Sequence, residues 1–335
     1  MNPIPEPGTS LDTVQAMRAI AATSVVLAHV PFIGVGVFGV DIFFVISGFI
    51  VAYVTAADAG HFLPKRIFRI VPLYWAGTLG VFAIALLLPG LLQSTTADPV
   101  NLLKSLLFIP YVRDNGDIAP MLPLGWTLNY EMFFYLLYSL ALRIDAQRAP
   151  WLAIAAIAAI VAAGQVLEPA HVVPAFFSSP VLLEFTYGLG AYLLWRHHRG
   201  YFTRIPPLLS LAVAAVALAA MCAAAPGSAA NGVRWLPLGV PALAFFLCVL
   251  SMQGKWRMPA LLVVTGDASY SLYLFHMYVV QLVHRKLYPL DTLSPAGALV
   301  AALVVVLCVF LAWLSFRFFE KPANRWLRSR LPRAR

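Results

Sequence analysis

The sequence predicts an all-α integral membrane protein with about ten transmembrane helices. Of its 335 residues, 61% are hydrophobic and only 11% are charged, whereas soluble domains average about 25% charged residues. Apolar runs of roughly 20 residues, the length that crosses a bilayer as a helix, recur from end to end. A β-barrel would instead show alternating segments of about 10 residues. The composition argues against soluble enzymes, disordered proteins and nucleic-acid-binding domains.

Ten apolar runs, bounded by Pro, Gly and charged residues, are expected to be membrane spans. They cover residues 14–33, 34–56, 71–92, 124–144, 150–168, 174–195, 205–225, 233–253, 259–284 and 294–316. The segment 100–112 is too short to span and is expected to be an interfacial or re-entrant helix. We expect residues 1–335 to form one membrane domain, with a short N-terminal segment 1–13 and a basic tail 317–335.

The distribution of basic residues predicts the orientation. If the N-terminus is cytoplasmic, 18 of the 23 Lys and Arg residues fall on the inner side. The remaining five are Lys104, Arg113, Arg234, Arg285 and Lys286. By the positive-inside rule both termini are expected in the cytoplasm. Most of the net charge of +9 is therefore a topology signal, although cytoplasmic arginines can also bind phosphates or anionic lipid head groups.

The remaining small motifs are structural. Cys222, Cys248 and Cys308 are odd in number and embedded in apolar runs, so we interpret them as core residues without a disulfide framework or a metal site. The N-terminus lacks the basic region of a secretory signal, so the first apolar run is expected to be retained.

Ionisable residues inside spans are costly and usually mark function. By helical rise, His29, Asp41, Glu131 and His276 are all expected roughly 20–24 Å from the cytoplasmic boundary, in the outer half of the bilayer. Glu184 is expected nearer the midplane. Any one of these groups can instead be a structural ion pair or hydrogen bond between helices. A purely structural role for all four at one level is the weaker interpretation.

Two sets of arginines predict a binding surface for an elongated anion. Arg18 and His29 are 11 residues apart, so both lie on nearly one helix face, roughly 16 Å apart. Arg66 and Arg69, spaced i, i+3, would present one guanidinium face to phosphates on a helix, although Pro72 tends to disrupt such a helix. Coenzyme A has the matching form, with phosphates at one end and a thioester at the other. The alternatives are snorkelling of Arg18 and an ordinary positive-inside flank.

Several segments together resemble the integral-membrane acyltransferase family 3, from Leu11 to about Trp326. The segments are LDTVQAMRAIAATSVVLAH, FGVDIFFVISGFIVAY, KRIFRIVPLYW, GWTLNYEMFFYLLY, LLEFTYGLGAYLL, GDASYSLYLFH and FEKPANRWL. The family's motif positions correspond to Arg18, His29, Asp41, Ser47, Gly48, Arg66, Arg69, Trp126, Glu131, Glu184, Ser269, Tyr273 and His276. The wording of GWTLNYEMFFY is most similar to the branch of exopolysaccharide (succinoglycan-type) O-acetyltransferases. Met132 departs from relatives that carry a second acidic residue after the glutamate.

The resemblance implies an enzyme of the bacterial inner membrane that moves an acyl group, expected to be acetyl, from cytoplasmic acetyl-CoA to a glycan hydroxyl. His29 is the expected base, because imidazole titrates near neutral pH, with Asp41 or Glu131 orienting its ring. Direct attack and a transient acetyl-His29 both remain open. Arg18, Arg66 and Arg69 are expected to hold the donor. Residues expected to bind substrate are Trp126, His276, Glu184, Tyr273 and Ser269; for Trp126 an interfacial anchor is an equal alternative.

The expected partners are acyl-CoA, a polysaccharide or lipid-linked glycan acceptor, and membrane lipids, with no metal and no nucleic acid. Two other classes stay open at this point. One is a transporter or flippase for a glycan or lipid intermediate, because intramembrane His and carboxylates also build proton relays. The other is a non-catalytic scaffold of a polysaccharide export complex. Paired halves with broken helices, typical of secondary transporters, are not evident.

Overall fold

The structure is a computed structural model and describes residues 11–88, 90, 92, 95–228, 233–287, 289 and 294–332. Within these residues the fold is all-helical, with a single isolated antiparallel bridge between Val112 and Ile118. Most of the predicted N-terminal segment 1–13, the end of the predicted span 71–92 and the end of the tail 317–335 lie outside the described residues. The helices form two compact units.

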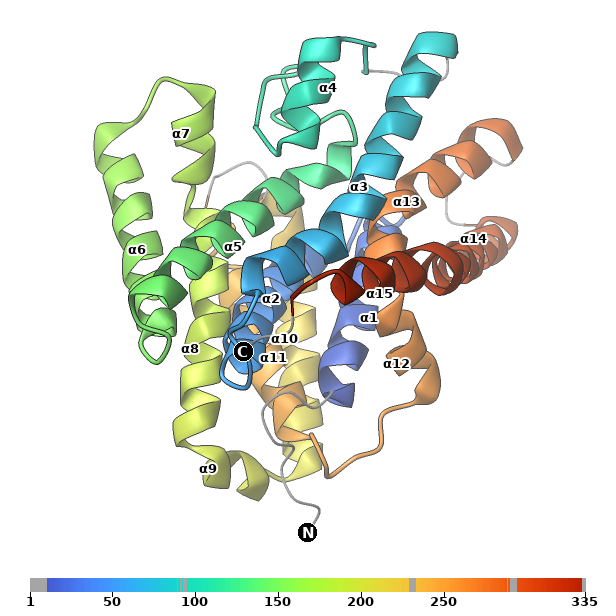
Figure 1. Cartoon of the computed structure of the whole chain (residues 1–335). Helices are drawn as coiled ribbons and strands as arrows, with labels where there is room; N and C mark the ends of the chain where they lie inside the picture. Colours follow the sequence, from blue (N-terminus) through green and yellow to red (C-terminus); the bar gives the residue numbers. More distant parts are fainter. Residues whose placement is uncertain are drawn as a thin grey trace. The chain divides into compact units, whose positions relative to one another are not determined.

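The first unit contains residues 1–59 and 183–317. Its helices are α1 (Asp12–Ala28), α2 (Gly39–Thr55), α8 (Leu183–His197), α9 (Arg199–Arg204), α10 (Pro207–Ser228), α11 (Gly239–Ser251), α12 (Ala260–Asp267), α13 (Ser269–Leu282) and α14 (Pro295–Ser315). Helix α1 packs against α2, α12 and α13, and α2 packs against α8 and α11 (Figure 1). Buried apolar side chains of α1, α13 and α14 form one cluster that includes Val26, Leu272 and Val304. This cluster positions α1 against α13.

The second unit contains residues 60–182 and 318–335. Its helices are α3 (Phe62–Leu87), α4 (Pro99–Leu106), α5 (Trp126–Ile144), α6 (Ala149–Leu167), α7 (Val172–Phe177) and α15 (Lys321–Ser329). Helix α3 packs against α4, α5 and α15, and α6 packs against α5 and α7 (Figure 1). The C-terminal helix α15 therefore joins the unit that begins near residue 60.

Within the part of the chain that the structure describes, five helical segments are long and apolar enough to cross a membrane by length and composition. They are Phe62–Leu87, Ala149–Leu167, Val172–His197, Pro207–Pro226 and Pro295–Ser329. Helices α2 and α11 are shorter and apolar. The membrane-helix character expected from composition is present.

Two of the predicted spans are interrupted. The predicted span 174–195 consists of α7 and α8, because Pro180 lacks a backbone N–H and starts a short 3-10 segment between them. The predicted span 259–284 consists of α12 and α13, and Ala268 between them has φ −86° and ψ 3°, outside the helical region. Both breaks place a functional candidate, Glu184 or Ser269, in the first turn of a new helix.

Helix α3 begins at Phe62, nine residues before the expected start of the span at residue 71. Pro64 lies in the first turn, where a missing N–H costs little, and the helix continues through Pro72. Arg66 and Arg69 are therefore on a helix, and the expectation that Pro72 disrupts it was wrong.

Candidate active site

His29 and His276 are in direct contact in the first unit. His29 is the C-cap residue of α1, which ends at Ala28, before the expected end of the span at residue 33. The Nε2 atom of His276 lies 3.2 Å from Nδ1 of His29, and the ring centroids are 5.0 Å apart at 67°. His276 is 1% exposed, whereas His29 is partly exposed.

Backbone carbonyls determine which nitrogen of each ring carries the proton. Nδ1 of His29 lies 2.9 Å from the Val25 carbonyl oxygen, and Nδ1 of His276 lies 3.0 Å from the Leu272 carbonyl oxygen. A carbonyl only accepts, so both Nδ1 atoms donate. The Nε2 atom of His276 is then an acceptor, and His29 Nδ1–H is shared between it and Val25. In the neutral ring, Nε2 of His29 carries the free lone pair and has no hydrogen-bond partner among the described residues.

Arg18 and Ser269 make a second contact between α1 and α13. Nε and Nη2 of Arg18 donate to the Ser269 hydroxyl oxygen at 3.0 and 2.9 Å. Because Arg18 meets the start of α13 and His29 meets its middle, the two helices run parallel. The expected face carrying Arg18 and His29 is therefore the face that packs on α13.

Asp41 is paired with Arg234. Arg234 Nη2 and Nε donate to the two carboxylate oxygens of Asp41 at 2.6 and 3.0 Å, and Nη2 also donates to the Val37 carbonyl at 3.2 Å. Asp41 is fully buried, and the Arg234 side chain is 18% exposed. The Asp41 carboxylate is thus paired with Arg234, whereas Nδ1 of His29 contacts the Val25 carbonyl and His276.

Glu184 lies beside this ion pair as a second buried carboxylate. It is 0% exposed and interacts electrostatically with Asp41 and Arg234. Neither of its oxygens has a hydrogen-bond partner within the described part of the chain. Tyr273 lies between the two clusters, with its ring centroid 6.3 Å from that of His276 and its hydroxyl in electrostatic reach of Arg234.

Two glycines bring α2 and α8 together. A Cβ atom on Gly48 would lie 2.1 Å from the Phe185 carbonyl oxygen, and one on Gly188 would lie 2.1 Å from the Val45 carbonyl oxygen. The helices run parallel, as the ring contacts Phe44–Phe185 and Tyr53–Trp195 indicate. The absence of side chains at this crossing lets the two backbones touch and brings Asp41 and Glu184 close.

In the second unit, Glu131 belongs to a cluster with Tyr135 and Arg66. The Tyr135 hydroxyl, one helical turn along α5, donates to Glu131 Oε1. The Arg66 guanidinium lies 5.6 Å from the ring centroids of both Phe62 and Tyr135. Arg66 is 8% exposed and is in electrostatic reach of Glu131 and Arg69. Glu131 and the two expected donor-binding arginines of α3 therefore belong to one unit.

Trp126 begins α5 and contacts Tyr130 edge-on, with ring centroids 6.0 Å apart. Between Trp126 and Glu131 lies Asn129, which is 1% exposed and whose amide oxygen and nitrogen have no partner among the described residues. A buried polar group of this kind usually has an explanation in function or in an absent ligand.

Sequence reasoning missed Arg234 and Asn129. Arg234 had been counted only as a basic residue on the outer side. A buried carboxylate needs a cation, so the position of Asp41 close to the outer boundary indicates a partner among the few basic residues on that side. For Asn129 the signal was a polar residue two positions before Glu131 inside an apolar run.

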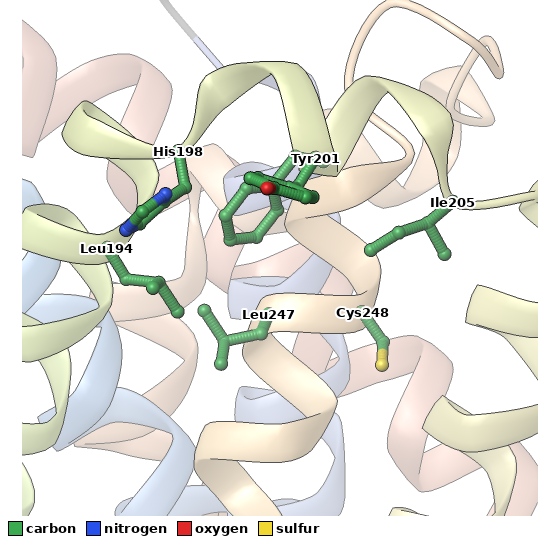
Figure 2. A pocket seen from close by; sticks show the side chains of 7 residues that line it. Leu194, His198, Tyr201, Ile205, Leu247 and Cys248 are labelled. Carbon is green, nitrogen blue, oxygen red and sulfur yellow. The ribbon is translucent and has the colours of Figure 1, made fainter.

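A separate cavity of about 320 Å³ lies near the junction of α8, α9 and α11. Its lining, most of which is labelled in Figure 2, includes none of the predicted site residues and consists of Leu194, His198, Tyr201, Phe202, Ile205, Leu247 and Cys248. Nearby, Lys255 Nζ donates to the Phe202 and Ile205 carbonyls at 2.6 and 2.8 Å, and partial burial lowers the pKa of Lys255. No group of three or more His, Cys, Asp or Glu suited to a metal occurs among the described residues.

The family of the chain follows from comparison with known proteins. Residues 11–316 match the sequence profile of the acyltransferase domain of acyltransferase family 3. The chain belongs to acyltransferase family 3. The matched residues include residues 60–182 of the second unit and all but the two ends of the first.

The chain is similar to the exopolysaccharide production protein ExoZ of Rhizobium meliloti (strain 1021). The two are 33% identical over 307 residues, covering 88% of this chain and 92% of the relative. No solved structure matches the chain. The resemblance to acyltransferase family 3, and within it to an exopolysaccharide production protein, is therefore confirmed.

Proposed function

We propose that this family 3 acyltransferase moves an acetyl group from cytoplasmic acetyl-CoA to a hydroxyl of an extracytoplasmic or lipid-linked glycan. We place the enzyme in the bacterial inner membrane with ten spans and both termini in the cytoplasm. The parallel directions of α1 with α13 and of α2 with α8 support this topology, because each pair consists of spans expected to cross in the same direction. The name of the similar exopolysaccharide production protein supports a glycan acceptor.

The observation that carries the proposal is the free Nε2 atom of His29. The neutral His29 ring carries its proton on Nδ1, which donates to the Val25 carbonyl. Nε2 can therefore take the proton of an incoming hydroxyl. The alkoxide oxygen then forms a bond to the thioester carbonyl carbon, and the carbon–sulfur bond breaks. The thiolate of CoA takes the proton back from His29. His276 accepts from Nδ1–H of His29 and so holds the ring in this tautomer.

The arginines are proposed to hold the donor, and the other polar groups to bind the acceptor or to support the base. Arg18, fixed by Ser269, lies on the same helix as His29 and suits an anionic part of the donor. Arg66 and Arg69 suit its phosphates. Trp126 is proposed to stack on a sugar ring, and Glu131 to accept a hydrogen bond from the acceptor beside Tyr135. Asp41 is proposed to act indirectly, through Arg234, together with Glu184 and Tyr273.

The decisive experiment compares His29→Ala with His197→Ala. His197 also places Nδ1 near the carbonyl four residues back, at 2.8 Å from Leu193, so its loss controls for the missing helix-end hydrogen bond. With purified protein, labelled acetyl-CoA and polysaccharide, we expect His29→Ala to lose on the order of 10²–10⁴-fold in rate. His197→Ala should retain the wild-type rate. Full acetylation by His29→Ala, or glycan movement without chemistry in the wild type, would refute the proposal.

A further inference from the structure

Three arginines of the second unit converge from two segments far apart in the sequence. Arg66 and Arg69 lie on α3, and Arg328 lies near the end of α15, which packs against α3 (Figure 1). Arg328 is in electrostatic reach of both Arg69 and Arg66. We infer that Arg328 completes, with Arg66 and Arg69, a single binding site for a phosphate group. The inference rests on the proposed function only in naming acyl-CoA as the source of that phosphate.

Arg66 is buried, and its guanidinium makes no hydrogen bond in the described part of the chain. Its side chain is 8% exposed, and its guanidinium faces the rings of Phe62 and Tyr135 at 5.6 Å each. Within the described residues its N–H groups make no hydrogen bond and no salt bridge. A buried guanidinium normally fills several of its five donors. The rings hold this one in place from two sides and leave its donors for a ligand.

Positive charge exceeds negative charge in this cluster. Three guanidiniums are grouped here, and among the described residues Glu131 is the one carboxylate in electrostatic reach of Arg66. Arg69 and Arg328 likewise make no salt bridge in the described part of the chain. Like charges held together repel one another, and a phosphate removes that repulsion while accepting bidentate hydrogen bonds. The cluster therefore suits an anion carrying more than one negative charge.

The three arginines are expected on the side of the membrane where phosphate compounds are found. The predicted topology puts the start of α3 and the whole of α15 on the cytoplasmic side. Cytoplasmic phosphates come from two sources there, namely a soluble nucleotide thioester and the head groups of anionic lipids. Both offer the same chemistry to the three arginines, so the experiment must separate them.

Helix α15 supplies a matched control. Arg330 directly follows α15, and its guanidinium lies 5.0 Å from the ring centroid of Trp326, an aromatic residue of that helix. We would measure equilibrium binding of inorganic pyrophosphate and of CoA to the purified full chain, for the wild type, Arg328→Ala, Arg66→Ala and Arg330→Ala. Repeating the measurement in nanodiscs of phosphatidylcholine, with and without phosphatidylglycerol, tests the lipid source. Thermal unfolding verifies that each variant is folded.

We expect Arg328→Ala and Arg66→Ala each to weaken binding of both probes about tenfold, and Arg330→Ala to change it less than twofold. If CoA binds and Arg328→Ala binds it like Arg330→Ala, the inference is wrong while the proposed donor stands. If pyrophosphate binding depends on Arg328 but CoA does not bind, the site stands and the proposed donor fails. Competition by phosphatidylglycerol that disappears in Arg328→Ala would assign the site to lipid phosphate. Absence of any binding by the wild type would overturn the inference.

Discussion

Nδ1–H of His29, at the end of α1, donates to Nε2 of His276 on α13 across 3.2 Å. Each ring is also anchored to the carbonyl four residues before it, Val25 for His29 and Leu272 for His276. The buried ring is therefore oriented by its own helix and in turn orients the partly exposed one. This order of dependence makes His276 a positioning residue for His29.

We expect His276→Ala to lower kcat about a hundredfold while leaving the KM for acetyl-CoA within twofold. The reason is that the His29 ring loses its acceptor and its alignment, and misplacement by about 1 Å costs a factor of this size. His276→Gln should recover part of the loss, because an amide oxygen can stand near the position of Nε2. Steady-state kinetics on the three proteins test this. Equal losses in the Ala and Gln variants would contradict a positioning role.

Removing one partner of the Asp41–Arg234 pair should destabilise the protein strongly. We expect Arg234→Gln to lower the free energy of unfolding by about 3–5 kcal/mol, because it leaves the buried Asp41 carboxylate without a counter-charge. Asp41→Asn should cost less than Arg234→Gln, because Glu184 still lies beside Arg234. The double variant should lose less than the sum of the two single losses. Denaturant unfolding in detergent measures all three.

Glu184→Gln is the matched comparison for that pair. One guanidinium neutralises only one of the two buried carboxylates, so the neutral form is favoured at position 184, and glutamine has the size and neutrality of that form. Since the Glu184 oxygens make no hydrogen bond in the described part of the chain, we expect unchanged or increased stability. A loss as large as that of Asp41→Asn would show that Glu184, and not Asp41, is the main counter-ion.

The backbone contact between α2 and α8 predicts opposite outcomes for two glycines of one helix. Gly188→Ala would place a Cβ 2.1 Å from the Val45 carbonyl oxygen, whereas nothing lies within 4 Å of a Cβ on Gly190. We expect Gly188→Ala to destabilise by about 1–3 kcal/mol or more, and Gly190→Ala to be neutral or stabilising by roughly 0.5–1 kcal/mol. Thermal unfolding of the two variants compares them directly. Equal melting temperatures would contradict the close approach.

Arg66→Lys tests whether binding of the acyl donor depends on the shape of the guanidinium and not only on its charge. Lysine keeps the charge but lacks the planar fork, so we expect the KM for acetyl-CoA to rise about tenfold with kcat within twofold. The exposed Arg143, in the last turn of α5, gives the control Arg143→Lys, for which both constants should stay at wild-type values. A fall in kcat alone would place Arg66 in the chemistry and not in donor binding.

The membrane class, the helical character and the family could be predicted because they depend on composition and on motif residues visible along the chain. The level of His29 and His276 along their helices could be predicted too, since the rise per residue is constant. The partner of Asp41 could not, because pairing with Arg234 depends on how α2 meets the loop before α11. The breaks before α8 and at Ala268 could not be predicted either, because apolar residues flank both Pro180 and Ala268. Backbone geometry at such positions is settled by packing, which periodicity does not report.

The path of the chain has a practical consequence for work on this enzyme. The second unit is built from residues 60–182 together with 318–335, so its last helix is made after the whole of the first unit has been synthesised. A deletion or a bulky tag at the C-terminus would therefore disturb the packing of α15 against α3. Helix α3 lies about 250 residues earlier in the chain, and it would be affected before α14, which directly precedes α15 in the sequence. Tags placed for purification are better separated from Ser329 by a flexible linker.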